Sequence, residues 1–259
     1  MHDITLFEMW GPIRKDFIDS HLFYVEQARK RLLSQFDNVD QEAEQAAEEW
    51  LEEAGEYFDP DMHDPGDFYE AAYDKSIEFG LLLSEMMDQT RLSVIAGMFH
   101  QWEKQLRDWL AKETKYWGGE TVVSKIWSVN LGEIFTLFEG LGWNVRDEVF
   151  FAKIDTCRLV VNVYKHGKGT ALKELRKKYP KYFIDSLPEM KDLLELDESF
   201  LDHTHLMVNN EDVDEFSEAI AEFWKKVPER FMNSQTIFAP KWLEDALLKD
   251  REIRNNRNK

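Results

Sequence analysis

The sequence predicts an all-α protein, a helical bundle with at most one short β element. Apolar residues recur three or four positions apart through most of the chain, the spacing that places them on one face of an α-helix. Residues 68–116 contain no proline and only two glycines, and 203–208 is the single segment predicted as a strand. Hydrophobic residues make up 43% of the 259 residues, which is enough apolar surface to bury a full core.

Three helices are predicted in the first half of the chain. Pro12 opens the first, which should end near Asp37, and the second covers 39–57. Residues 59–66 hold two prolines and a glycine and are expected to form a loop or linker. Beyond it, 68–116 is expected to form one very long helix or two abutting helices.

Glycines divide the second half into shorter helices. The predicted ranges are 120–138, 146–166, 170–179, 211–226 and 240–251. A glycine pair at 118–119 precedes the first range, and glycines at 140 and 142 and at 167 and 169 separate the first three. The organisation predicted from these breaks is an acidic N-terminal helical segment (1–58), a helical core (67–183) and a C-terminal helical extension (184–259). One continuous domain is the alternative.

Charge is distributed very unevenly along the chain. The formal net charge is −19, and residues 37–78 alone hold sixteen acidic residues against one basic residue, Lys75. Residues 151–181 reverse this, with nine basic residues against two acidic ones. The acidic run is either a solvated helix face or a docking surface for a basic partner, and the basic segment is either a solvated face or a seat for phosphates.

Cysteine and hydropathy patterns bear on the compartment. The only cysteine, Cys157, cannot form an internal disulfide, so a reducing compartment and a buried core thiol are expected. No window is apolar enough for a membrane span, and the first residues lack the layout of a signal peptide. We therefore expect a cytoplasmic protein that does not contact a membrane.

The most concentrated chemical signal is in the predicted helix 146–166. Asp155, Arg158, Asn162 and His166 are three or four residues apart and should share one face of that helix. These residue types suit cleavage of a phosphodiester beside a hydroxyl: the imidazole moves the proton, the guanidinium holds the phosphate oxygens and the amide orients either group. RNA supplies that hydroxyl as its 2′-OH, and no metal or other cofactor is required.

The run from Arg158 to Phe183, RLVVNVYKHGKGTALKELRKKYPKYF, resembles the signature helix and following loop of HEPN-like proteins. These are helical domains of prokaryotic toxin and phage-defence systems, and many are metal-independent ribonucleases. The resemblance covers roughly residues 69–183. It implies a HEPN-like core whose arginine and histidine, Arg158 and His166 here with Asn162 between them, form a site across a homodimer.

This chain departs from the family pattern in two respects. Seven residues separate Arg158 from His166, against four to six in the family, and Leu159 follows the arginine where a polar residue is common. The alternative to an active site is therefore a chain that keeps the fold with a rearranged or inactive one.

Other polar residues carry weaker signals. His203 and His205 could meet a metal from one face of a strand, but no third ligand has matching spacing, so no metal site is predicted. Arg91 and His100 are nine residues apart and fall on opposite faces of their helix. The chain has no phosphate-binding glycine loop, dinucleotide fingerprint or serine nucleophile elbow.

The leading functional hypothesis is a metal-independent endoribonuclease of toxin–antitoxin or antiviral defence. Its predicted catalytic residues are Arg158, Asn162 and His166, and its predicted substrate-binding residues are Lys165, Lys168, Arg176, Lys177 and Lys178. RNA, a second copy of the chain and an antitoxin or defence-complex protein are the expected partners. The alternative is a non-catalytic interaction module, or a structural subunit of a defence complex, that binds a protein through its acidic surface.

Overall fold

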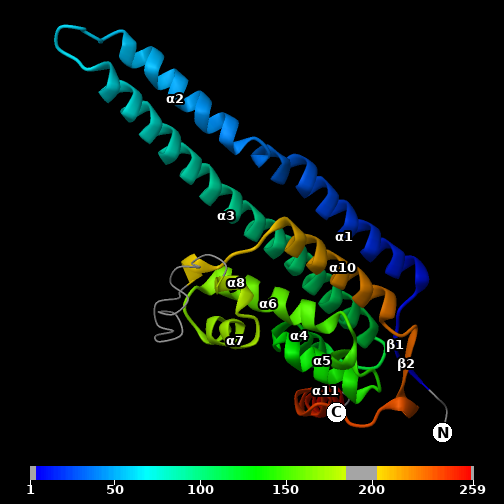
Figure 1. Ribbon diagram of the computed structural model, residues 1–259. Coiled ribbons are helices and arrows are strands. Elements are labelled where there is room, and N and C mark those ends of the chain that lie inside the picture. Colours follow the sequence, from blue (N-terminus) through cyan, green and yellow to red (C-terminus); the bar gives the residue numbers. More distant parts are fainter. Residues whose placement is uncertain (1–3, 185–202, 258–259) are drawn as a thin grey trace.

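A computed structural model describes residues 4–184 and 203–257 and shows an almost entirely helical chain (Figure 1). The first half contains β1 (Thr5–Glu8), α1 (Gly11–Arg31), α2 (Val39–Gly55) and α3 (Pro65–Thr114). The next elements are α4 (Glu120–Ser128), α5 (Leu131–Gly140), α6 (Phe151–His166), α7 (Thr170–Lys178) and α8 (Lys181–Ile184). The last are α10 (Asn210–Lys226), β2 (Arg230–Met232) and α11 (Lys241–Arg257), and 3₁₀ helices lie at Leu33–Phe36, Val145–Asp147, His203–His205 and Asn233–Gln235. The predicted all-α class is confirmed.

The spine of the molecule is α3, a single helix of 50 residues. Asp64 caps its start by accepting a hydrogen bond from the Gly66 N–H at 2.8 Å, and Pro65 occupies the first turn, where no backbone N–H is needed. No proline follows within the helix, so nothing removes a hydrogen bond from its interior. At 1.5 Å per residue the helix is about 75 Å long.

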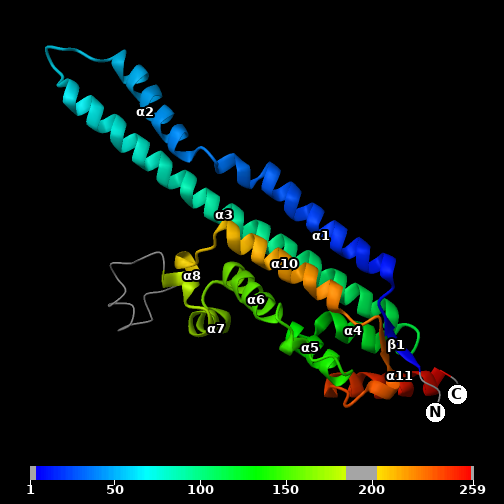
Figure 2. The same ribbon diagram turned by 45° about the vertical axis from the view of Figure 1, so that its right-hand side comes forward.

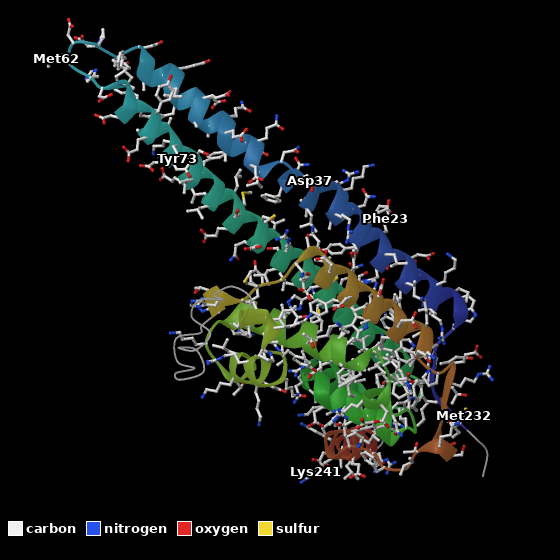
Figure 3. All side chains as sticks on the ribbon, viewed as in Figure 1. Phe23, Asp37, Met62, Tyr73, Met232 and Lys241 are labelled. Carbon is white, nitrogen blue, oxygen red and sulfur yellow. The ribbon has the colours of Figure 1, made fainter. Side chains whose placement is uncertain are left out.

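The chain doubles back on α3 to form an arm, defined here as residues 39–90. Figures 1 and 2 show α2 running antiparallel to the first half of α3, with the pair projecting away from the other helices. Figure 3 places Met62 at the tip. Small side chains let the two helices approach closely, because a Cβ added at Gly80 would lie 3.5 Å from that of Ala43. The rings of Trp50 and Phe68 also pack together, with centroids 6.0 Å apart.

The second half of α3 is buried in the body of the molecule. Trp102 is fully buried and packs edge-on against Phe223 of α10, with ring centroids 5.1 Å apart. The same core cluster includes side chains from Phe7 to Ala246. Helix α10 packs on α1, α3 and α6, so residues near both ends of the chain contribute to one core.

The minor β element lies elsewhere than predicted. Residues 203–208 are a 3₁₀ helix followed by irregular backbone, so the strand prediction there was wrong. The alternation of apolar and polar residues in that segment arises because Leu206 and Val208 are both buried in the core, although the backbone there is irregular. The observed sheet pairs β1 antiparallel with β2, with Phe7 opposite Phe231 and a register irregularity between Thr5 and Phe7.

Two predicted helices are also divided or shortened. The range 120–138 contains two helices, because Asn130 caps α5 by accepting a hydrogen bond from the Glu133 N–H at 3.0 Å. The helix predicted from residue 146 begins at Phe151, after the 3₁₀ helix that starts at Val145. This later start leaves Arg146 outside α6, where it reaches toward α5.

Candidate functional site

Helix α6 positions the predicted site residues. Its apolar face is buried against α3 and α10. Asp155, Arg158 and Asn162 are half-buried and lie on another side of the helix. Gly167 ends α6 with a φ of 64°, a conformation that favours glycine, and its N–H donates to the Val163 carbonyl at 2.8 Å. This glycine stop makes His166 the last residue of the helix.

Asp155, Arg158 and Asn162 line one cleft of about 560 Å³. The cleft lies between the second half of α3, α5, α6 and α7. Its wall mixes four cations, three carboxylates, two asparagine amides and three phenylalanine rings: Arg107, Arg146, Arg158, Lys178, Glu103, Asp155, Glu174, Asn130, Asn162, Phe99, Phe135 and Phe151, together with Leu131 and Gly132. Charged donors beside apolar rings suit a ligand with both an anionic and a flat apolar part.

A network of ion pairs fixes the charges of the cleft. The Arg158 guanidinium donates to Oδ1 of Asp155 from Nε at 3.1 Å and from Nη2 at 2.6 Å. Lys178 donates to Oδ2 of Asp155 at 3.2 Å and to Oε1 of Glu174 at 2.6 Å, and Glu174 also lies 3.7 Å from Arg158. Both predicted cations in the cleft are therefore paired with carboxylates.

These contacts set the protonation states. Burial opposes ionisation of Asp155, but hydrogen bonds and charges from Arg158 and Lys178 outweigh it and hold the pKa of this carboxyl below its ordinary value. The hydrogen bond to Glu174, together with Asp155, raises the pKa of Lys178. Asp155 stays charged at neutral pH and acts as the orienting group for Arg158.

The predicted imidazole lies outside the cleft lining. His166 is exposed at the end of α6, about 6 Å along the helix axis from Asn162. Lys165 and Lys168 are exposed beside it, and His203 packs over Gly167, since a Cβ added there would lie 3.3 Å from Nδ1 of His203. The structure thus brings Arg158 and Asn162 together in the cleft and leaves His166 accessible, about one turn beyond Asn162 and two turns beyond Arg158.

The other predicted substrate-binding residues are on α7. Lys178 lines the cleft, Lys177 is exposed, and Arg176 is half-buried and already has an interaction partner. The apolar residues of this helix, Leu172 and Leu175, are buried against the body. The cations of α7 therefore fall into two groups, one facing the cleft and one facing solvent.

Comparisons with protein-family models, curated proteins and solved structures give no match. In the part of the chain that the structure describes, no group of three or more His, Cys, Asp or Glu residues could hold a metal ion. Within the same residues, no helix has the length and apolar character needed to cross a membrane.

Two arginines of the cleft wall were not predicted from the sequence. Arg107 is buried in α3, where it donates to Oε1 of Glu103 from Nε at 3.0 Å and from Nη2 at 2.6 Å, and to the Ile126 carbonyl from Nη1. Arg146 pairs with Glu139 and donates to the Gly132 carbonyl at 2.9 Å. The available signal was a charged residue, Arg107, at an apolar position of a periodic helix, which indicates a buried ion pair.

The other polar residues considered in the sequence, Cys157, His100 and Arg91, are accounted for by packing and hydrogen bonds within the fold. Cys157 is fully buried, and desolvation raises the pKa of its thiol, so the thiolate needed for nucleophilic attack is disfavoured. His100 packs against Phe99, and burial lowers the pKa of its imidazole, with the charge of Glu103 opposing and that of nearby Lys165 adding to the effect. Arg91 donates to Asp88 and Asn210 at 2.9 and 3.0 Å, and its side chain is only 15% exposed.

Proposed function

We propose that this chain is a metal-independent endoribonuclease of the HEPN type that works as a homodimer in prokaryotic toxin–antitoxin or antiviral defence. One observation supports the proposal: Arg158 and Asn162 line a polar cleft, and His166 is exposed on the same helix, about one turn beyond Asn162 and two turns beyond Arg158. An RNA strand lying along α6 would pass all three side chains, which span about 12 Å of the helix axis from Arg158 to His166.

The proposed chemistry divides the work among these groups. The 2′-hydroxyl loses a proton and attacks the adjacent phosphorus, and the 5′-oxygen leaves with a proton, so the products end in a 2′,3′-cyclic phosphate and a 5′-hydroxyl. His166 makes one of these proton transfers, and His166 of a second copy makes the other. Arg158 stabilises the additional negative charge on the phosphorane through its forked donors. Asn162 orients the phosphate.

The ion pairs of the cleft define what RNA must displace. Arg158 already donates to Asp155 through Nε and Nη2, so a phosphate binds either at the remaining edge of the guanidinium or in exchange for a carboxylate. Exchange with Glu174 is easier, because Glu174 lies 3.7 Å from Arg158, whereas Asp155 is paired with both Arg158 and Lys178. The exposed Lys165, Lys168 and Lys177 then attract the rest of the strand.

Cleavage of RNA in EDTA tests the proposal. Purified protein is incubated with total RNA and with tRNA, and fragments are analysed for 2′,3′-cyclic phosphate ends. Wild-type protein should cleave, and His166→Ala should lose about a hundredfold or more of the rate, the usual contribution of a positioned acid or base. Arg158→Lys keeps the charge but loses the fork, and should lose rate as well.

His63→Ala is the matched control, because His63 is an exposed histidine at the tip of the arm. It should cleave at the wild-type rate. Absence of cleavage by folded wild-type protein over a wide concentration range, or equal rates for wild type and His166→Ala, would contradict the proposal.

A further inference from the structure

A groove runs along one side of the arm, far from the cleft. It has a volume of about 340 Å³ and lies between α2 and α3. Ala46 and Trp50 of α2 and Phe79 and Leu82 of α3 form its apolar wall. Met86 is one turn beyond Leu82 and continues the same face of α3. Phe79, Leu82 and Met86 are 39%, 59% and 59% exposed, which is unusual for large apolar side chains on adjacent turns.

The edge of this groove is acidic. Glu49 and Glu53 line it from α2 and Glu78 from α3. The only lysine in the lining, Lys75, is already paired with Glu78 at 2.7 Å. A second acidic surface, formed by Glu44, Glu48 and Glu52, covers the neighbouring face of α2. Any occupant must therefore bring both apolar side chains and positive charge.

Neither the arm nor the basic segment of a second copy meets that requirement. The arm of another copy has the same seventeen acidic residues against one basic residue over 39–90, so two arms repel each other. The basic segment around α7 has the right charge, but Leu172 and Leu175 are buried against the body and cannot enter a groove. The charge of the groove therefore favours a basic partner protein as the occupant, and a second copy that binds through another face is an outcome of the test below.

We propose that the arm is a docking surface for a basic amphipathic helix of a partner protein. The partner helix presents apolar side chains three, four and seven residues apart to Phe79, Leu82 and Met86, and its lysines or arginines face Glu49, Glu53 and Glu78. This interaction is separate from the nuclease proposal, because it uses none of the residues of the cleft.

A designed peptide tests the chemistry of the groove. The probe is a fluorescent helix-forming peptide of about 18 residues, with leucines on one face and lysines elsewhere, a length of roughly 27 Å as a helix. A second peptide has the same composition with the leucines scattered around the axis. Binding to the full chain is measured by fluorescence anisotropy at about 50 mM and about 300 mM salt. The patterned peptide should bind, more weakly at high salt, and the scattered peptide should bind at least about tenfold more weakly.

Paired variants locate the binding face. Leu82→Ser with Met86→Ser should weaken binding of the patterned peptide about tenfold or more. Tyr73→Ser with Ile77→Ser is the matched control: these residues are 66% and 44% exposed on another face of the same helix, and binding should change by less than about twofold. Helicity of each variant is checked by circular dichroism.

Three results would overturn the proposal. Equal affinity for the two peptides would mean that the arm recognises only the charge of the peptide. Equal losses in the two double variants would mean that the groove is not the binding face. Concentration-dependent dimerisation that the Leu82 and Met86 substitutions abolish would assign the groove to a second copy of the chain.

Discussion

Replacing Asp155 by asparagine removes the charge at the centre of the cleft while keeping the size of the side chain. Asp155 accepts two hydrogen bonds from Arg158 and one from Lys178, and its side chain is only 13% exposed. A hydrogen bond to a charged group contributes about 1.5–3 kcal/mol when buried. Arg158 and Lys178 are 26% and 47% exposed, so solvent screens much of this interaction, and we expect a loss of about 1–2 kcal/mol in the free energy of unfolding.

The pH dependence of this loss identifies its cause. The folded-state pKa of Asp155 lies below its ordinary value of 3.8, so ionised Asp155 stabilises the fold above that pH, and the contribution is lost as the pH falls through the folded-state pKa. The difference between wild type and Asp155→Asn should therefore be constant near neutral pH and disappear in acid. Urea unfolding followed by circular dichroism across that range measures it.

Asp19→Asn is the control, because Asp19 pairs with Lys15 in an exposed salt bridge. Its effect at neutral pH should stay below about 0.5 kcal/mol. An equal loss in both variants, or a loss for Asp155→Asn that persists in acid, would refute the view that the cleft is held together by this charge.

Further predictions concern the packing between helices. Asp250→Ala removes the α11 carboxylate that accepts from the backbone N–H groups of Thr121 and Val122 at 3.0 and 3.2 Å, and should cost about 1–2 kcal/mol in urea unfolding, with the exposed Asp245→Ala near zero. Gly140→Ala puts a Cβ about 2.2 Å from the Phe238 carbonyl oxygen and should cost about 1–3 kcal/mol, whereas Gly55→Ala, with open space around it, should not lower the melting temperature. Burial lowers the pKa of His21 despite its hydrogen bond to Ser217, so stability should decrease as the pH falls below 6.5, and His21→Leu should flatten that slope; an unchanged slope would contradict the argument.

The helical part of the fold could be predicted because its signals are local. Apolar spacing and the glycine pairs were enough to place α3, predicted over 68–116 and observed as Pro65–Thr114, and the ends of most other helices. The small sheet could not be predicted in this way, because β1 has four residues, β2 has three, and their pairing joins positions more than 220 residues apart in the sequence. The break at Asn130 did have a local signal, an asparagine three residues before Glu133, and was missed because the apolar spacing continues across it.

The cleft was only partly predictable for a similar reason. Helical spacing alone placed Asp155, Arg158 and Asn162 on one side of α6. Their ion-pair partners on α7 and the walls supplied by Arg107 and Arg146 depend on how helices pack, which spacing within one helix does not specify. His166 obeys the spacing but lies in the last turn, where the helix extends beyond the elements that enclose the cleft.

The length of α3 has a consequence for how the molecule would act on large targets. Leu82 on the arm and Glu103 in the wall of the cleft belong to one uninterrupted helix and are about 32 Å apart along its axis. A protein bound to the arm would therefore lie at a fixed distance from the cleft and in a fixed orientation to it. Inserting whole turns into α3 would increase the distance between the arm surface and the cleft without altering either one.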